Sequence, residues 1–122
     1  LPKYRYLELK NFCFQYNDWK RALARLDGWR AQEGDMGGIV KSNVPSDPTA
    51  REGTLRAYYS QHIELIDRCI AKIEPALQTY IRKGVTEGLS YKSLSARGCP
   101  CGSQMYYDFY RKFFWLLSIE RQ

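Results

Sequence analysis

The chain has 122 residues, enough for one domain with a core of its own. Its 19 Lys and Arg against 13 Asp and Glu leave a formal charge of +6, and the sequence pI is near 9.2, which suits an acidic partner such as nucleic acid. The longest apolar stretch, Phe113 to Leu117, has only five residues, so no membrane-spanning helix is expected. The 15% aromatic content excludes a disordered or collagen-like chain.

The first 45 residues predict helix followed by a glycine-rich loop. Apolar residues between Leu1 and Leu26 recur at roughly helical spacing, with a bend expected at Tyr16 and a second short helix over residues 19–26. Gly28 is expected to end that helix. Over residues 29–45 the helical periodicity fails, and Gly, Ser and Asn indicate a loop.

Residues 46–122 predict a long central helix and a second group of helices, in one compact domain with residues 1–45. Asp47 and Pro48 are a strong helix start, because Asp47 can accept hydrogen bonds from first-turn amides and Pro48 is preset for the first helical position. Pro75 must interrupt the helix, since it removes a backbone donor and disfavours helical geometry at Glu74. A further helix is then expected over residues 76–86.

An apolar stripe with steps of three or four residues runs along the predicted central helix. One interpretation is a seam between two copies of the chain, near the 3.5-residue coiled-coil period, which would make a homodimer. The other is that the stripe packs on the helices of residues 1–26. Replacing Ile66 and Ile70 by aspartate distinguishes the two interpretations. The substituted chain would be a folded monomer if the stripe is a seam, and it would unfold if the stripe is part of the core. The residues of the stripe are Leu55, Tyr59, Ile63, Ile66, Ile70 and Ile73.

The C-terminal third predicts a short helix, a turn and a longer helix. Ser90 can cap the short helix, which has Leu94 inward, and residues 98–102 hold too many Gly and Pro for regular helix. Ser103 is expected to cap a final helix that runs to about Ile119. Strand-like alternation is absent from the sequence, so the predicted fold class is all-α. Two helices joined by a glycine-containing turn are the sequence form of a helix-turn-helix.

A helical wheel of the final helix separates an apolar side from a polar face that could read DNA. Gln104 can pair with adenine and Arg111 with guanine, both in the half of the helix where base contacts usually occur. From Arg82 to the C-terminus the sequence has seven basic and three acidic residues, so much of the excess positive charge lies in this third of the chain. The alternative is an ordinary solvated face on a core helix. The residues expected to contact DNA are Lys92, Arg97, Ser103, Gln104, Tyr107, Arg111 and Lys112.

No enzyme signature is found: the sequence has no Gly-rich phosphate loop, no His beside a nucleophile and no carboxylate cluster. Cys99 and Cys101 flank one proline, one residue short of the Cys-x-x-Cys spacing of zinc and redox motifs. Cys99, Cys101, His62 and one more thiol could form a zinc site, but a plain loop is favoured because no second ligand pair follows. We therefore expect four free thiols, with Cys13 and Cys69 as small buried hydrophobes, and neither a metal nor a cofactor.

Residues 87–94, Glu-Gly-Leu-Ser-Tyr-Lys-Ser-Leu, resemble the first helix of the helix-turn-helix in region four of sigma factors. A wider pattern, from Ser-Asp-Pro-Thr-Ala-Arg at residues 46–51 to Phe-Tyr-Arg-Lys-Phe-Phe-Trp-Leu-Leu at 109–117, resembles the ArpU and RinA late transcriptional regulators of phages and prophages of Gram-positive bacteria. The resemblance implies an N-terminal helical region, a linker, a central helix and a sigma-like helix-turn-helix. It further implies double-stranded DNA and host RNA polymerase as partners, in the bacterial cytoplasm.

These observations favour a phage-encoded transcriptional regulator that binds DNA. An alternative from another class is a phage-encoded adaptor or inhibitor that docks on a host protein, and a DNA-packaging component is a third. Salt dependence separates the first two, because a protein that contacts several phosphates loses DNA affinity steeply as salt rises.

Overall fold

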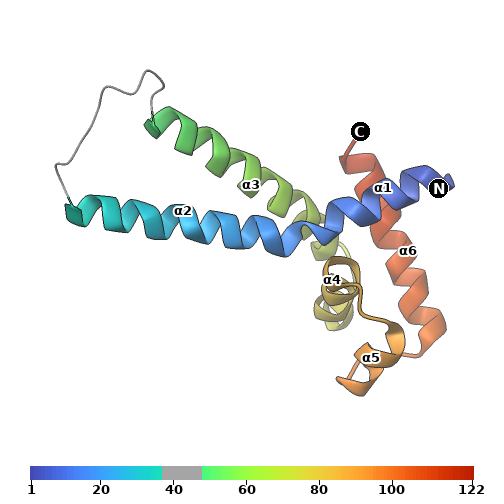
Figure 1. The fold of residues 1–122 in the computed structure, drawn as a ribbon. Coiled ribbons are helices and arrows are strands. Elements are labelled where there is room, and N and C mark those ends of the chain that lie inside the picture. The colour runs from blue at the N-terminus through green and yellow to red at the C-terminus, as the bar shows by residue number, and fades with distance from the viewer. Residues whose placement is uncertain (37–47) are drawn as a thin grey trace.

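In the computed structural model of the chain, α2 and α3 extend away from a cluster formed by α1, α4, α5 and α6 (Figure 1). The structure describes residues 1–36 and 48–122, with the side chains of 1–28 and 49–122. The described residues contain no strand, which confirms the all-α prediction, and none of their helices combines the length and apolar content needed to cross a bilayer. In chain order the elements are α1 (Lys3–Phe14), α2 (Tyr16–Met36), α3 (Pro48–Ala71), the 3-10 turn η1 (Pro75–Leu77), α4 (Gln78–Glu87), α5 (Tyr91–Ala96) and α6 (Ser103–Glu120).

The first two helices follow one another with a bend at a single residue. Gln15 has φ −87° and ψ −6°, and its N–H donates to the carbonyl of Phe12 at 3.2 Å. The bend lies one residue before its predicted position at Tyr16. Helix α2 starts directly after it, so the predicted start at Trp19 was three residues late.

The predicted end of this helix was wrong. Helix α2 continues through Gly28 to Met36, so residues 29–36 are helical and not part of a loop. A glycine inside a helix costs about 1 kcal/mol relative to alanine. That penalty is small beside the packing of α2 along α3, which the sequence pattern does not reveal. Residues 37–45 of the predicted loop lie outside the described residues.

Helices α2 and α3 lie side by side and run in opposite directions (Figure 1). The ring of His62 on α3 packs edge-on against Trp19 of α2, with 4.8 Å between centroids. Further along, Arg56 of α3 forms an ion pair with Asp27 of α2. Helix α3 starts at Pro48 as predicted, while the Asp47 cap lies outside the described residues.

The interruption before α4 is where the sequence predicted it. Helix α3 ends at Ala71, and the turn η1 begins at Pro75. Across the break, Nε2 of Gln78 donates to the carbonyl of Ile73, two residues beyond the end of α3, at 3.0 Å. The chain therefore changes direction at Pro75 without leaving that carbonyl unpaired.

The inner half of α3 is buried within this chain, which corrects the self-association prediction. Ile66 and Ile70 are 0% exposed and Ile73 is 2% exposed, and they share one core with residues of α1, α4 and α6. Those three side chains are therefore unavailable to a second copy, and this half of the stripe packs within the chain, against α4 and α6 as well as the N-terminal α1. The remaining stripe residues, toward the outer end of α3, are Leu55, Tyr59 and Ile63, which keep part of their surface exposed.

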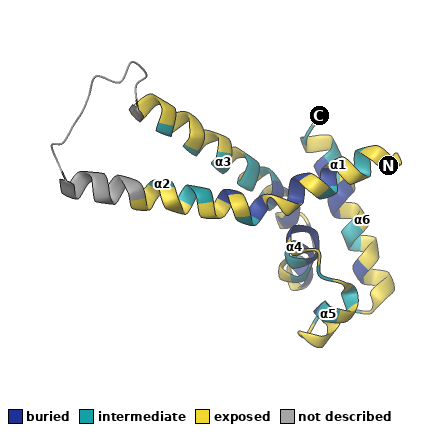
Figure 2. Ribbon diagram, viewed as in Figure 1, coloured by how far each residue is buried: buried dark blue, intermediate teal, exposed yellow. Residues whose placement is uncertain are grey.

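One hydrophobic core lies where α1, α3, α4 and α6 meet (Figure 2). It draws side chains from both predicted segments, residues 1–45 and 46–122, so these two stretches fold around a single core. Cys13 and Cys69 are fully buried in it, as the sequence predicted. Burial raises the pKa of Cys69 to about 11 and that of Cys13 further, so both stay protonated and unreactive at neutral pH.

Tyr16 connects α2 to α3 and α4 through a shared carboxylate. Its hydroxyl donates to Oδ1 of Asp67 at 2.8 Å, and Nη2 of Arg82 donates to the same oxygen at 3.3 Å. Burial, together with the adjacent Asp67, raises the pKa of Tyr16 to about 12. The folded state therefore holds this proton more tightly than the unfolded state. Its contribution to stability is fully present below about pH 10 and is lost as the pH rises through about 12.

Tyr16→Phe is expected to lower the free energy of unfolding by about 1 kcal/mol at pH 7, because it removes one part-buried hydrogen bond to a charged acceptor. It should also reduce the loss of stability between about pH 10 and 12. Urea unfolding at pH 7, 10 and 12 measures both effects. Tyr4→Phe, at an exposed tyrosine, is the control. If stability falls with pH as steeply in Tyr16→Phe as in the parent, the assignment is wrong.

Candidate nucleic-acid interface

A glycine in the left-handed conformation separates α4 from α5. Gly88 has φ +73°, and its N–H donates to the carbonyl of Gly84 at 3.1 Å, which ends α4. Ser90 then caps α5, as predicted: its hydroxyl accepts a hydrogen bond from the N–H of Ser93 at 3.2 Å. Leu94 on α5 points into the core and is fully buried.

Residues 97–102 connect α5 to α6 without regular helix, in agreement with the sequence. The predicted cap at Ser103 was wrong by one residue. The N–H of Tyr106 donates to the carbonyl of Gly102 at 3.0 Å, so Gly102 is the N-cap and Ser103 is the first residue of α6. The helix ends at Glu120, one residue beyond the expected end.

Helices α4, α5 and α6 contact one another at Gly84. A Cβ added there would lie 2.0 Å from the hydroxyl oxygen of Tyr106 on α6 and 3.5 Å from Cδ1 of Leu94 on α5. A residue without a side chain is therefore needed at this position. The contact helps to hold the N-terminal half of α6 in one orientation relative to α4 and α5.

One face of α6 is locked in the core and the opposite face is open (Figure 2). Of the six residues that the helical wheel places on the apolar side, three are buried and three are half-buried, and Phe114, which the wheel left out, is fully buried. The buried three are Tyr106, Phe113 and Leu117, and the half-buried three are Phe109, Tyr110 and Leu116. All seven residues predicted to contact DNA are exposed, on α5, on the connection or within residues 103–112 of α6. They are Lys92, Arg97, Ser103, Gln104, Tyr107, Arg111 and Lys112.

The cations of this surface differ in how they are paired. Nη2 of Arg111 lies 2.5 Å from Oδ1 of Asp108, one turn earlier on α6, in an exposed ion pair. Exposed pairs of this kind contribute about 0–1 kcal/mol, so a phosphate or a base can replace Asp108 at little cost. Lys92, Arg97 and Lys112 form no ion pair with any described residue. These three are the cations most readily available to an anionic partner.

The two cysteines of the connection lie close together but are joined to no third ligand. The sulfur atoms of Cys99 and Cys101 are 3.9 Å apart, and the hydroxyl of Tyr91 donates to the carbonyl of Cys101 at 2.7 Å. Partial burial and the neighbouring Cys99 thiol raise the pKa of Cys101. His62 packs instead against Trp19 in the α2–α3 pair. Within the described residues no three His, Cys, Asp or Glu side chains gather where they could hold a metal ion.

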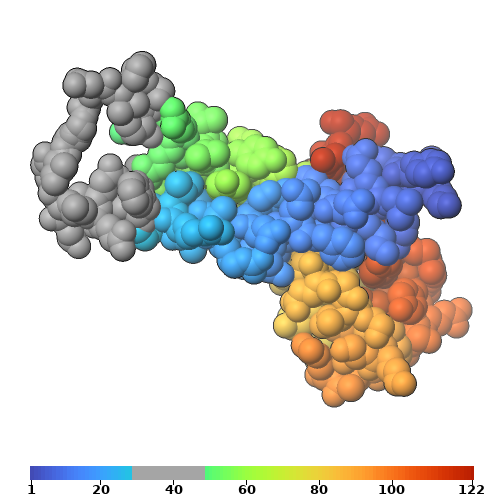
Figure 3. Space-filling model, in the orientation of Figure 1, coloured from blue at the N-terminus to red at the C-terminus, as the bar shows by residue number. Residues whose placement is uncertain are grey.

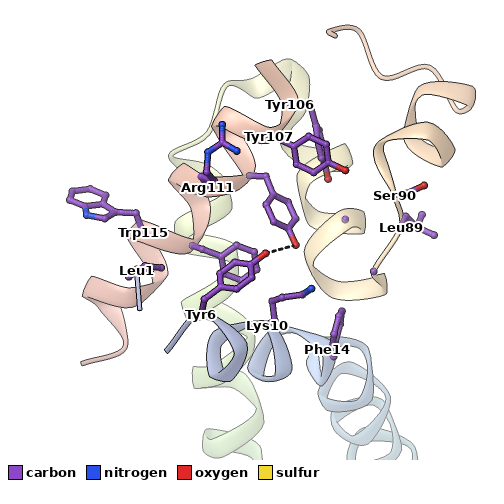
Figure 4. A pocket seen from close by; sticks show the side chains of 14 residues that line it. Leu1, Tyr6, Lys10, Phe14, Leu89, Ser90, Tyr106, Tyr107, Arg111 and Trp115 are labelled. Atoms are coloured by element: carbon purple, nitrogen blue, oxygen red, sulfur yellow. Dashed lines mark hydrogen bonds between the residues drawn. The ribbon is translucent and has the colours of Figure 1, made fainter. Parts of the chain in front are cut away.

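A cleft of about 790 Å³ opens beside this surface, between α1, the α4–α5 turn and α6 (Figures 3 and 4). Tyr107 and Arg111 line it and are also among the predicted DNA contacts. Sequence reasoning missed the contributions of Tyr6 and Lys10 from α1. Only the packing of α1 against α6 brings them to the cleft, and no local signal in the sequence indicates it.

Comparison with known proteins finds no match to this chain among family models, curated proteins or solved structures. The functional argument therefore depends on the residues and the geometry described above.

Proposed function

We propose that the chain is a DNA-binding transcriptional regulator that contacts double-stranded DNA through the exposed face of α6. The observation that carries this proposal is the exposure of polar and basic side chains along α5, the connection and residues 103–112 of α6. The other face of the same helix is buried in the core, so its exposed face is rigidly oriented. A rigid helix presented in this way suits insertion into the major groove.

Two side chains on this face have the chemistry for base recognition. Gln104 and Arg111 are seven residues apart, which is about 10.5 Å along a helix and close to the length of three stacked base pairs. Gln pairs bidentately with adenine and Arg with guanine. Lys92 and Lys112, which lack carboxylate partners among the described residues, are suited to phosphates on either side.

The resemblance to the ArpU and RinA regulators adds a phage origin and host RNA polymerase as a partner to this proposal. A phage-encoded regulator with a sigma-like helix-turn-helix would act on late promoters together with host RNA polymerase, in the cytoplasm of the bacterial host. The short α5, the connection and the long α6 are consistent with such a unit. Selection of bound duplexes from a random pool identifies the preferred site, which then serves as the target in titrations.

Arg111→Ala is expected to weaken binding to the preferred site by about 1–3 kcal/mol and to relax the preference at one base pair. Lys112→Ala should weaken binding to all duplexes alike and reduce the slope of log affinity against log salt by about one. Fluorescence anisotropy at several salt concentrations measures both. Each variant is first shown to be folded by its melting curve.

Arg21→Ala is the matched control. Arg21 pairs with Asp18 one turn earlier on α2, and its side chain is 64% exposed against 66% for Arg111. It therefore has the same kind of ion pair at a distance from the proposed interface, and its loss should leave DNA binding unchanged. If Arg111→Ala and Gln104→Ala bind every duplex as the parent does, α6 is not the recognition helix.

A protein-binding adaptor is the second candidate, favoured by apolar side chains exposed on α1 and α6. Tyr4 is 78% exposed and Trp115 is 56% exposed, and a partner protein would remove this aromatic surface from water. A parent protein that binds no duplex even at low salt would exclude the regulator and leave this function.

A further inference from the structure

The cleft between α1, the α4–α5 turn and α6 has the size and walls of a small-molecule site. Its volume of about 790 Å³ lies within the range of about 300–1,000 Å³ typical of ligand pockets. Half of its lining residues are aromatic, among them Tyr6 on α1 and Tyr106, Tyr107 and Tyr110 on α6. Such rings offer flat apolar faces and polar edges to a planar ligand.

The cleft is also electropositive, and Lys10, one of its two cationic side chains, has no counter-charge among the described residues. Lys10 and Arg111 line it, and no described residue of its lining carries a carboxylate. Lys10 forms no ion pair with any described residue, and its Nζ lies 5.6 Å from the ring centroid of Tyr6. In Figure 4 the side chains of Tyr6 and Lys10 rise from α1 into the space between α6 and the α4–α5 turn. An anionic group there would gain a cation that currently has no partner.

A buried hydroxyl at the cleft is without a hydrogen bond. Tyr106 is 1% exposed, and its hydroxyl has no partner among the described residues, although it lies beside Gly84 in the same lining. Leaving a buried hydroxyl unpaired is costly, and such groups are rare in folded proteins. Its neighbour Tyr110 makes only a long 3.4 Å contact with the hydroxyl of Tyr6. Burial raises the pKa of Tyr106 and of Tyr110, so both hydroxyls keep their protons and can donate to a ligand.

We propose that this cleft binds a small planar aromatic molecule that carries a carboxylate or a phosphate. The ring stacks among the tyrosines of α1 and α6, the anionic group pairs with Lys10, and a polar atom of the ligand pairs with the hydroxyl of Tyr106. Tyr107 and Arg111 belong to the rim of this cleft and to the proposed DNA surface. A ligand bound in the cleft therefore lies against the proposed DNA surface and is expected to compete with DNA, a consequence that rests on the proposed function.

The binding test uses chosen probes and no DNA. Isothermal titration calorimetry of the full chain with 2-naphthoate and with 1-naphthyl phosphate distinguishes carboxylate from phosphate recognition. 2-Naphthamide has the same rings without the charge, and cyclohexanecarboxylate has the charge without a planar ring. We expect one site per chain for a naphthyl anion, with affinity at least about tenfold weaker for both control compounds.

Two variants assign the contacts. Lys10→Met keeps an apolar side chain of similar length and removes the charge. It should lower the affinity for the naphthyl anion by about tenfold or more without changing the affinity for 2-naphthamide. Tyr106→Phe should lower the affinity for the naphthyl anion by about threefold to tenfold. It should leave the unliganded protein at least as stable as the parent, because the lost hydroxyl had no partner. Lys20→Met is the matched control, since Nζ of Lys20 lies 5.2 Å from the ring centroid of Tyr16 but outside the cleft.

Two results would overturn the ligand site. One is that neither naphthyl anion binds at millimolar concentration. The other is that the anions bind but Lys10→Met has no more effect than Lys20→Met. A DNA titration with the bound probe then tests the competition separately. If the probe binds as expected and the protein has no affinity for DNA, the ligand site stands and only the proposed function fails.

Discussion

Replacing Ile66 or Ile70 of α3 by aspartate is expected to unfold the chain. Both side chains are fully buried in the core shared by α1, α3, α4 and α6, and an ionised carboxylate there would have no partner. Burying an unpaired charge costs several kcal/mol or more, which is comparable with the whole stability of about 5–15 kcal/mol of a typical domain. Circular dichroism and urea unfolding measure the outcome.

Leu55→Asp is the matched control on the same helix. Leu55 lies 11 residues before Ile66, which places the two within about 20° of each other around the helix axis. Leu55 is 37% exposed, so a carboxylate there remains hydrated and the variant should stay folded. A folded monomer for Ile66→Asp would contradict the buried position of α3 and restore self-association through this face.

Gly84→Ala is expected to destabilise the chain at the contact of α4, α5 and α6. The added methyl group would lie 2.0 Å from the hydroxyl of Tyr106, so the two helices must move apart or the tyrosine must leave its position. Overpacking of this kind costs about 1–3 kcal/mol and outweighs the gain of about 1 kcal/mol that alanine brings to a helix interior. Thermal and urea unfolding measure the net change.

The second substitution Tyr106→Phe should rescue this variant. Without the hydroxyl, the nearest ring atom of residue 106 lies 3.4 Å from the added Cβ, which is close to ordinary contact. Gly84→Ala should therefore be neutral or stabilising in the Tyr106→Phe background. The coupling between the two substitutions should be about 1–3 kcal/mol. Equal costs for Gly84→Ala in both backgrounds would show that the hydroxyl is not the obstacle.

Several elements could be predicted because their stereochemistry is local. Ser90 caps α5 by accepting a hydrogen bond from an amide three residues later, and Pro75 interrupts the helix because of its own ring. The exposed face of α6 was also predictable, because a helical wheel separates polar from apolar positions using only the sequence and the helical period. Gln104 and Arg111 are exposed for that reason.

Other features could not be predicted because they depend on partners far away in the chain. Gly28 is of the residue type that commonly ends a helix, yet α2 continues through it along α3. The spacing of Ile66 and Ile70 is the same for an intramolecular core and for a seam between two copies. Burial by α1, α4 and α6 decides between the two.

The sequence by itself determined the all-α class, the starts of α3 and α5, and which side of α6 is apolar. These follow from interactions within a few residues and from the helical period. Only the tertiary structure decided that the inner half of the apolar stripe on α3 is buried within the chain, and that a cleft forms between α1, the α4–α5 turn and α6. Tyr6 and Tyr110 meet there across 104 positions of sequence. Such a contact depends on how whole helices pack, and helical periodicity contains no information about which helix covers which.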